Sequence, residues 1–280
     1  MAIGLALISS LLWGSADFQG GRMAKKHPAF AVTGLSQAIG LLFGVIVVAI
    51  SGGWEVPSFD SQGYFISGVF AGIAGYLGLS CLYAGLATGR MGVVSPISSL
   101  SAIIPATYAL IQGEKLLLLQ GIGIVVALTG AFCASGPEVS KGLSLKPLAL
   151  ALGAAVGFGV SLTFMARGSI TSALMTMVMM RVATLVISVL LALKLRTIGG
   201  FRAKDLPLLA IIGVADFAAN LLIGVASTRG LVSVVMVIGS LFPIMTALLA
   251  FQILHERLHR IQYLGIILAV AGIALISASQ

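Results

Sequence analysis

Long apolar stretches follow one another along almost the whole chain, separated by short joints. Each stretch is long enough for a helix that crosses a bilayer, which needs about 20 mostly apolar residues. The apolar positions do not alternate with polar ones, so membrane β-strands are not expected. The ten stretches cover residues 2–21, 30–50, 63–87, 92–112, 117–135, 147–167, 172–194, 206–228, 231–252 and 261–279. The pattern predicts an all-α integral membrane protein with ten transmembrane helices.

The joints hold Gly, Pro and nearly all the charged residues, as in residues 52–63 and 195–205. None of them is long enough to form a soluble domain. The first stretch is followed by its basic residues Arg22, Lys25 and Lys26, whereas a signal peptide carries its positive charge before the apolar region. We therefore expect the first stretch to be a retained helix.

Composition supports the same class of protein. Hydrophobic residue types make up 59% of the chain and charged types 9%, against roughly 45–50% and about 25% in soluble domains. A soluble fold with so few charges would expose large apolar patches, and a disordered chain needs low hydrophobicity. A water-soluble enzyme and a disordered protein are both excluded. The 35 glycines suit closely packed membrane helices.

The basic residues are unevenly divided between the joints. Of the 16 Lys and Arg residues, twelve lie in odd-numbered joints, three in even-numbered joints, and Arg181 lies within a stretch. Because cytoplasmic joints carry an excess of Lys and Arg, the odd joints are predicted to be cytoplasmic and both termini to be outside. Topology thus accounts for the net charge of +8, and no nucleic-acid partner is expected.

The chain contains an internal repeat. A shift of about 142 residues aligns residues 113–132 with 255–275 and places Glu114 on Glu256, and a shift of about 145 places Trp13 on Phe158. The predicted halves are 1–137 and 141–280, each with five helices. An odd number of spans forces the halves into opposite orientations. Inverted repeats with a binding site between them near the membrane midplane are a transporter design.

These features together resemble the EamA-type members of the drug/metabolite transporter superfamily. The resemblance rests on the opening WGSADFQGG at 13–21, the two five-helix halves, and the Gly-Glu and His-Glu pairs that open the fifth helix of each half. It implies a basket in which helices one to four and six to nine surround a central cavity, with the fifth and tenth helices at the periphery. It also implies export of amino acids, related metabolites or drugs.

One feature departs from that family pattern. Many relatives carry basic residues at the N-terminus and in the second joint, which implies cytoplasmic termini. Here the second joint contains Glu55 and Asp60 but no Lys or Arg, and the first joint is basic instead. Either this chain is inserted in the opposite orientation or the charge rule does not hold for it.

Three ionisable residues, Asp17, Arg181 and Asp216, lie within the predicted membrane stretches. A charge inside a bilayer costs about 2.5–3.5 kcal/mol on insertion scales, so each of them needs a partner or a function. One interpretation is a cavity charge pair or proton relay used in transport. The other is an Arg–carboxylate pair that only holds helices together. The repeat places Gln37 at the position that corresponds to Arg181.

Neutral polar residues accompany these charges. Asn220 lies one turn from Asp216, and Tyr76, Ser80 and Tyr83 share one face of the third stretch. Trp13 could stack on an apolar or aromatic substrate, or pack in the core. The serines of the fourth stretch recur every third residue, which suits either cavity lining or helix packing. The candidate substrate-binding residues are Trp13, Asp17, Gln37, Tyr76, Ser80, Tyr83, Ser95, Ser98, Ser101, Arg181, Asp216, Asn220 and Ser240.

Two prolines are candidate hinge or gating residues. Pro96 and Pro243 lie within the fourth and ninth stretches, where a proline can loosen a helix and free a backbone carbonyl.

A zinc-protease signature also occurs in the chain. Residues 255–259 match H-E-x-x-H, in which two His side chains bind the metal and Glu activates water. The match lies in a joint, its repeat partner at 113–117 has no His, and no clear third ligand follows. We therefore predict no metal and no other cofactor, and the absence of a phosphate-binding loop disfavours ATP-driven transport by this chain alone.

The sequence thus predicts a multi-pass secondary transporter of the cell membrane rather than an enzyme. Its partners would be the lipid bilayer, a small-molecule substrate of which amino acids are the first choice, and a coupling proton. The alternatives are a multidrug exporter, a sugar or metabolite uptake permease, a membrane scaffold and, from a different class, an intramembrane metalloprotease that uses residues 255–259.

The charge count leads to a test of orientation. A reporter that is active only in the cytoplasm should be silent when it is fused after Gln280, because the termini are predicted to lie outside. The same reporter fused after Lys204, in an odd-numbered joint, should be active. Activity after Gln280 with silence after Lys204 would reverse the orientation.

Overall fold

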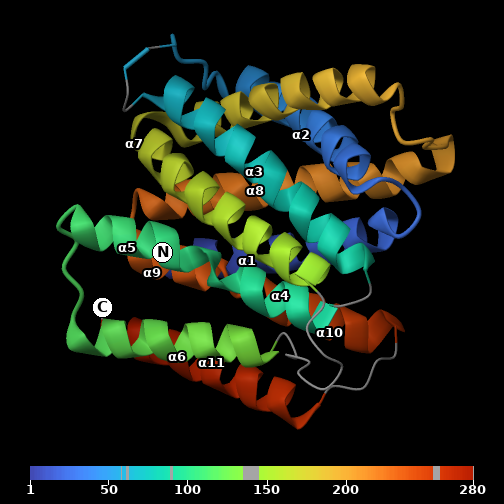
Figure 1. The fold of residues 1–280 in the computed structure, drawn as a ribbon. Helices are drawn as coiled ribbons and strands as arrows, with labels where there is room; N and C mark the ends of the chain where they lie inside the picture. Colours follow the sequence, from blue (N-terminus) through green and yellow to red (C-terminus); the bar gives the residue numbers. More distant parts are fainter. Residues whose placement is uncertain (58, 61–62, 89–90, 135–144, 255–258, 280) are drawn as a thin grey trace.

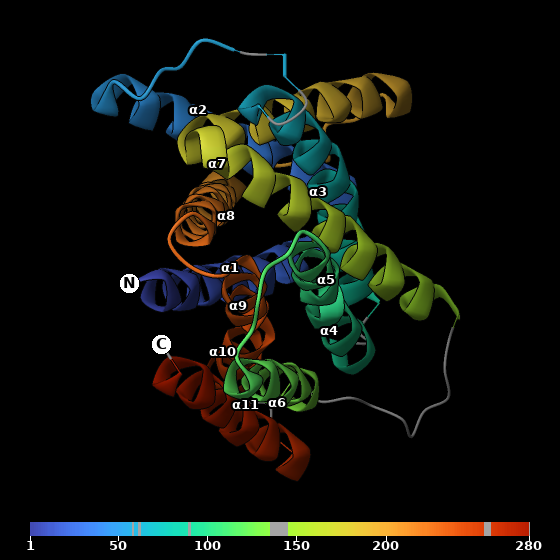
Figure 2. The same ribbon diagram turned by 90° about the vertical axis from the view of Figure 1, so that its left-hand side faces the viewer.

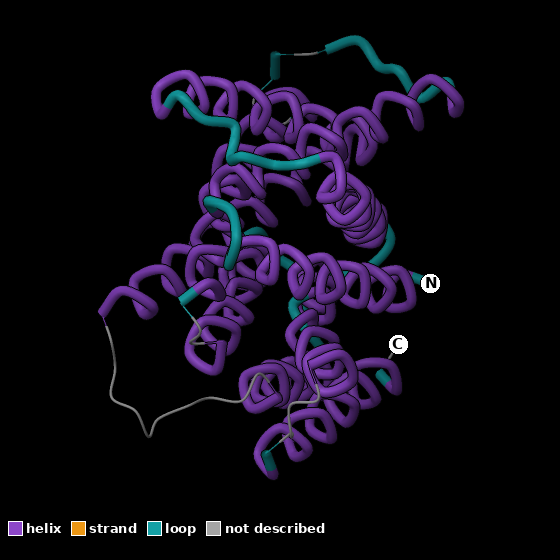
Figure 3. Tube along the Cα trace, turned by 90° about the vertical axis from the view of Figure 1, so that its right-hand side faces the viewer, coloured by secondary structure: helices purple, strands orange, loops and turns teal. Residues whose placement is uncertain are grey.

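The computed structural model describes residues 1–57, 59–60, 63–88, 91–134, 145–254 and 259–279. These residues form helices joined by turns and loops, with no strand among them, so the predicted all-α class is confirmed (Figures 1 and 3). The helices are α1 (Ala2–Ala24), α2 (Ala29–Ser51), α3 (Tyr64–Ala87), α4 (Met91–Ser99), η1 (Leu100–Ala102), α5 (Ile103–Ile111), α6 (Leu118–Ala134), α7 (Leu145–Leu195), η2 (Ala203–Asp205), α8 (Leu206–Ser227), α9 (Val232–Gly239), α10 (Phe242–Leu254) and α11 (Arg260–Ala278).

The ten predicted stretches fall on helical residues, but not every stretch is one continuous helix. The fourth is divided into α4, η1 and α5, and the ninth into α9 and α10. Among the described residues, six helical segments are long and apolar enough to cross a membrane by length and composition. The exact count of ten transmembrane helices therefore stays a prediction.

Helix α7 contains the sixth and seventh predicted stretches with a kink between them. Ser172 alone departs from helical geometry, with φ −156° and ψ 109°, and the ribbon turns sharply near this residue (Figure 1). The Ser172 hydroxyl accepts a hydrogen bond from the Met175 N–H at 3.4 Å. This is the arrangement of an N-cap, in which a serine satisfies a free N–H of a new helix. Ser172 therefore marks the boundary between the two stretches.

Helices α6 and α11 lie side by side at one end of the molecule (Figures 1 and 2). A methyl group added at Gly272 would lie 2.6 Å from the backbone nitrogen of Ala127, and one added at Gly123 would lie 2.9 Å from the carbonyl oxygen of Gly272. Glycines therefore let the two backbones approach closely, as in many membrane helix pairs. The pair takes the peripheral place that the family resemblance implies for the fifth and tenth helices.

The packing of the inner helices repeats between the two halves of the chain. A methyl group at Gly72 of α3 would collide with the carbonyl oxygen of Met180 in α7. A methyl group at Gly213 of α8 would collide in the same way with the carbonyl oxygen of Ser36 in α2. These positions correspond at shifts of 141 and 144 residues. Each half thus supplies one helix that packs backbone against backbone on a helix of the other half.

Both halves break a helix at the corresponding place. The interruption covers 100–102 in the first half and 240–241 in the second. Proline has no N–H, so Pro105 and Pro243 cannot donate to the carbonyls of Ser101 and Gly239, four residues earlier. Pro243 lies at its break as the sequence suggested, whereas Pro96 lies within α4, and Pro105 takes the place beside the break of the first half.

Glu114, in the joint between α5 and α6, holds the start of α9 in the other half. Its carboxylate accepts hydrogen bonds from the backbone N–H groups of Val232, at 2.8 Å, and Ser233, at 3.1 Å, and from the Ser233 hydroxyl. The first turn of a helix has free N–H groups and a partial positive charge, which an anion satisfies. The repeat partner, Glu256, lies outside the described residues.

This cap leads to a prediction about stability. Glu114→Ala should lower the free energy of unfolding by about 1–2 kcal/mol, the usual cost of losing a helix cap. Glu114→Gln should cost less, because the amide oxygen can still accept one of the bonds. Unfolding of the purified protein in detergent measures both. The exposed Glu55 serves as the control, and equal effects of Glu55→Ala and Glu114→Ala would contradict the capping role.

Candidate functional site

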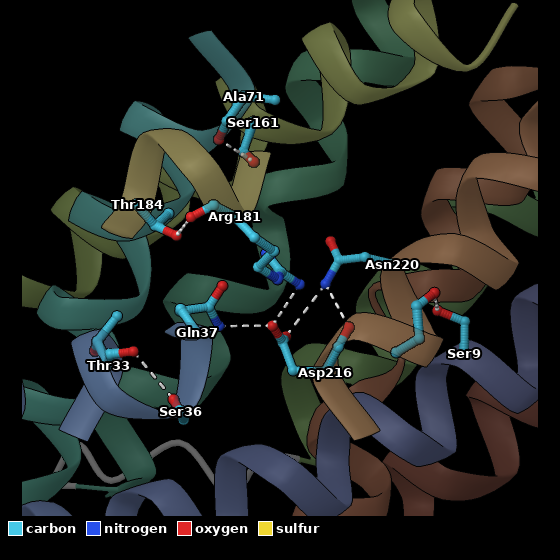
Figure 4. Close-up of polar contacts among 11 residues, drawn as sticks. Ser9, Thr33, Ser36, Gln37, Ala71, Ser161, Arg181, Thr184, Asp216 and Asn220 are labelled. Carbon is cyan, nitrogen blue, oxygen red and sulfur yellow. Dashed lines mark hydrogen bonds and ion pairs between the residues drawn. The ribbon is translucent and has the colours of Figure 1, made fainter. Parts of the chain in front are cut away.

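The carboxylate of Asp216 is the centre of a buried polar cluster in the middle of α8. Its Oδ2 accepts hydrogen bonds from Arg181 Nη2 at 2.8 Å and from Gln37 Nε2 at 2.7 Å, and its Oδ1 accepts one from Asn220 Nδ2 at 3.2 Å (Figure 4). The donors come from α7, from α2 and from α8 itself. Asp216 is 7% exposed and Arg181 3% exposed, so the ion pair is largely shielded from solvent.

The surroundings hold the guanidinium and the carboxylate in place. Asn220 also donates to the Asp216 backbone carbonyl at 2.7 Å, which fixes the amide one turn along the same helix. The guanidinium carbon of Arg181 lies 5.7 Å from the ring centre of Phe217, within the range of a cation–π contact. A methyl group at Gly40 would lie 2.9 Å from the carbonyl oxygen of Gly213, so a glycine at this position lets α2 approach α8 closely beside the cluster.

Gln37 and Arg181 occupy corresponding positions of the two halves, 144 residues apart, and both reach the same oxygen of Asp216. The cluster therefore joins the two halves at their interface. The first half contributes a neutral amide and the second half a charged guanidinium. Of the two intramembrane carboxylates, Asp216 is the one that pairs with Arg181, and Asp17 takes no part in the pair.

The cluster lines a central cavity of about 60 Å³. Nine of the thirteen candidate residues face it: Trp13, Asp17, Gln37, Tyr76, Ser101, Arg181, Asp216, Asn220 and Ser240. Ser80, Tyr83, Ser95 and Ser98 do not line it. The Ser98 hydroxyl donates to the Ser95 carbonyl at 3.0 Å, which fits the helix-packing interpretation of these serines.

Several lining residues were not predicted from the sequence. Phe158 and Phe242 add aromatic surface, and Thr184 adds a hydroxyl one turn from Arg181. Phe158 could have been found, because the repeat aligns it with Trp13. Phe242 could not, because only the break between α9 and α10 brings it to the cavity.

A larger cavity of about 540 Å³ lies toward the even-numbered joints. Residues from all four of those joints or their flanking turns line it, including Asp60, Glu114, Arg167 and Ser227. Helix α7 contributes to both cavities: Leu162 lines the central one and Thr163 the larger one. We call the larger cavity the vestibule.

The zinc-protease match gains no support from the structure. Residues 255–258 of the match lie outside the described residues, and only His259, directly before α11, is described. Within the described part of the chain, no group of three or more His, Cys, Asp or Glu side chains could hold a metal ion.

The chain resembles known proteins both in sequence and in fold. The model of the EamA-like transporter family matches residues 1–136 and 145–278. Among 28 matching chains of solved structures, one crystal structure of a protein aligns with 99% of this chain and 96% of its own, with a TM-score of 0.75 and 17% sequence identity. At that identity the similarity concerns the fold alone. No curated protein matches the chain. The division at 137 and 141 stays a prediction.

The ion pair generates a prediction about stability. Arg181→Met should lower the free energy of unfolding by about 3–5 kcal/mol, because it leaves the Asp216 carboxylate buried without its counter-charge. Combining it with Asp216→Leu should recover most of that loss, because no buried charge remains. Unfolding in detergent measures both variants. A double variant no more stable than Arg181→Met would contradict this account of the pair.

Proposed function

The chain belongs to the EamA-like transporter family, and we propose that it moves amino acids or related small metabolites by alternating access through the central cavity. The coarser class is established by the family: this is a multi-pass membrane transporter. The observation that carries the proposal is the Arg181–Asp216 pair, buried at a cavity between two inverted halves. Export across the cell membrane is the direction we propose.

The arginine supports a substrate that carries a carboxylate. A guanidinium binds a carboxylate through two parallel N–H groups, and such charge-assisted bonds are about twice as strong as neutral ones. When no substrate is bound, Asp216 forms an ion pair with Arg181. We propose that the substrate carboxylate takes over this contact, while Gln37 and Asn220 continue to hold Asp216. The site would then never expose an unpaired arginine to the membrane interior.

The cavity sizes support a site that opens and closes. A volume of about 60 Å³ is well below the roughly 300–1,000 Å³ of ligand-binding pockets. The vestibule, at about 540 Å³, is far larger. A substrate therefore requires the helices around the central cavity to separate. The helix breaks at 100–102 and 240–241 supply backbone freedom at the cavity itself. In the predicted orientation the vestibule opens to the outside.

A multidrug exporter is the second candidate. Trp13, Tyr76, Phe158 and Phe242 give the cavity an aromatic lining, and binding sites for varied drug-like molecules are lined mainly by apolar and aromatic side chains.

Transport by purified protein in liposomes tests the proposed function. The substrates are a panel of radiolabelled amino acids, with and without a proton gradient across the vesicle membrane. We expect uptake of at least one amino acid, with a dependence on the gradient. Transport of cationic dyes without transport of any amino acid would favour the multidrug exporter instead.

Arg181 variants separate a transport role from a structural one. Arg181→Ala should abolish transport more completely than it lowers expression, and Arg181→Lys should restore little, because lysine presents a point charge in place of a two-pronged donor. The double variant Arg181→Met/Asp216→Leu should be stable but inactive. Transport by that double variant would show that the pair only holds helices together.

A further inference from the structure

Asp17 is a second buried carboxylate at the central cavity, and it lacks the partners that Asp216 has. It lies in α1, is 6% exposed and lines the cavity. It makes no hydrogen bond or ion pair with any residue that the structure describes. A buried charge without a partner is costly, so its partner is expected to enter through the cavity.

The charges around the cavity define what that partner must be. The side chains that line it and can carry a charge near pH 7 are Asp17, Arg181 and Asp216, and the arginine is already bound to Asp216. Arg181 therefore pairs with one of the two carboxyl groups, and Asp17 is the one that no basic side chain of the cavity contacts.

From this we infer that Asp17 binds the ammonium group of the transported substrate. The inference rests on the proposed transport function and names a second subsite, separate from the one that Arg181 would offer to a carboxylate. A substrate with both groups, such as an α-amino acid, would place its two charges on two different side chains of the cavity.

The surroundings of Asp17 suit an ammonium ion. Trp13 lies one turn earlier on the same face of α1 and also lines the cavity, so its ring can attract a cation. On α3, the Tyr83 hydroxyl is buried and has no hydrogen-bond partner among the described residues. Tyr83 lies against Gly20, one turn after Asp17. An ammonium group has three donors and no acceptor, and it matches a carboxylate with a neighbouring hydroxyl oxygen.

Three small ligands test the subsite by isothermal titration calorimetry on the purified full-length protein. They are L-leucine, 3-methylbutylammonium, which lacks the carboxylate, and 4-methylpentanoate, which lacks the ammonium group. The variants are Asp17→Asn, which keeps the shape and removes the charge, and Asp17→Ser, in case the first does not fold. Asp205→Asn is the matched control, because Asp205 lies outside the cavity at the start of α8.

We expect 3-methylbutylammonium to bind the unmodified protein, and its affinity to fall about 10- to 100-fold in both Asp17 variants, the usual effect of losing a charge-assisted hydrogen bond. Leucine should behave in the same way if amino acids are the substrates, and 4-methylpentanoate should be unaffected. Asp205→Asn should change none of the affinities.

The possible failures are distinguishable. If the amine binds through Asp17 but leucine does not bind, the subsite stands and the amino-acid substrate fails. Unchanged amine binding in the Asp17 variants would overturn the subsite. Loss of the proton dependence of transport together with unchanged amine binding would also overturn it, because Asp17 would then serve the proton. Failure of both ammonium compounds to bind the unmodified protein would overturn it as well.

Discussion

A charge inside the membrane must be neutralised by the protein, and in this chain that requirement joins the two halves. Asp216 would be too costly to bury alone, and its partners Arg181 and Gln37 come from helices of opposite halves. The helices around the cluster are therefore held in one arrangement by polar contacts at its centre as well as by apolar packing at its edges. The cavity exists because these polar groups meet there in place of close-packed side chains.

The frame of the protein is nearly symmetric, but the chemistry at its centre is not. The glycine contacts at Gly72 and Gly213 and the two helix breaks recur between the halves. At the cavity the corresponding residues differ. A shift of 141 residues places Gly75 where the second half has Asp216, and a shift of 145 places Leu162 where the first half has Asp17. A symmetric frame suits the alternating access that we propose, whereas recognition of a substrate needs groups of different charge at different places.

The sequence predicted the features for which a single residue or stretch carries a large free-energy cost inside the membrane. Apolar stretches predicted the helices, because unsatisfied backbone groups are too costly inside a bilayer. The cost of a charge inside the membrane predicted that Arg181 would pair with a carboxylate. The sequence marked Pro96 and Pro243 as positions that loosen a helix, and a break does lie beside Pro243, but the break of the first half lies beside Pro105. Hydropathy does not register a change in backbone direction. The position of Phe242 depends on such a break. Ser95 and Ser98 were placed at the cavity because serine spacing alone does not tell which face of a helix meets a neighbour.

The closed Arg181–Asp216 pair also determines how the membrane potential acts on the protein. A potential of 100 mV does about 2.3 kcal/mol of work on one elementary charge that crosses the membrane. A pair with no net charge that moves together with α7 and α8 experiences almost none of it. The inner helices could therefore rearrange without working against the voltage, and in the transport cycle that we propose the electrical cost would fall on Asp17 and the cation that it binds.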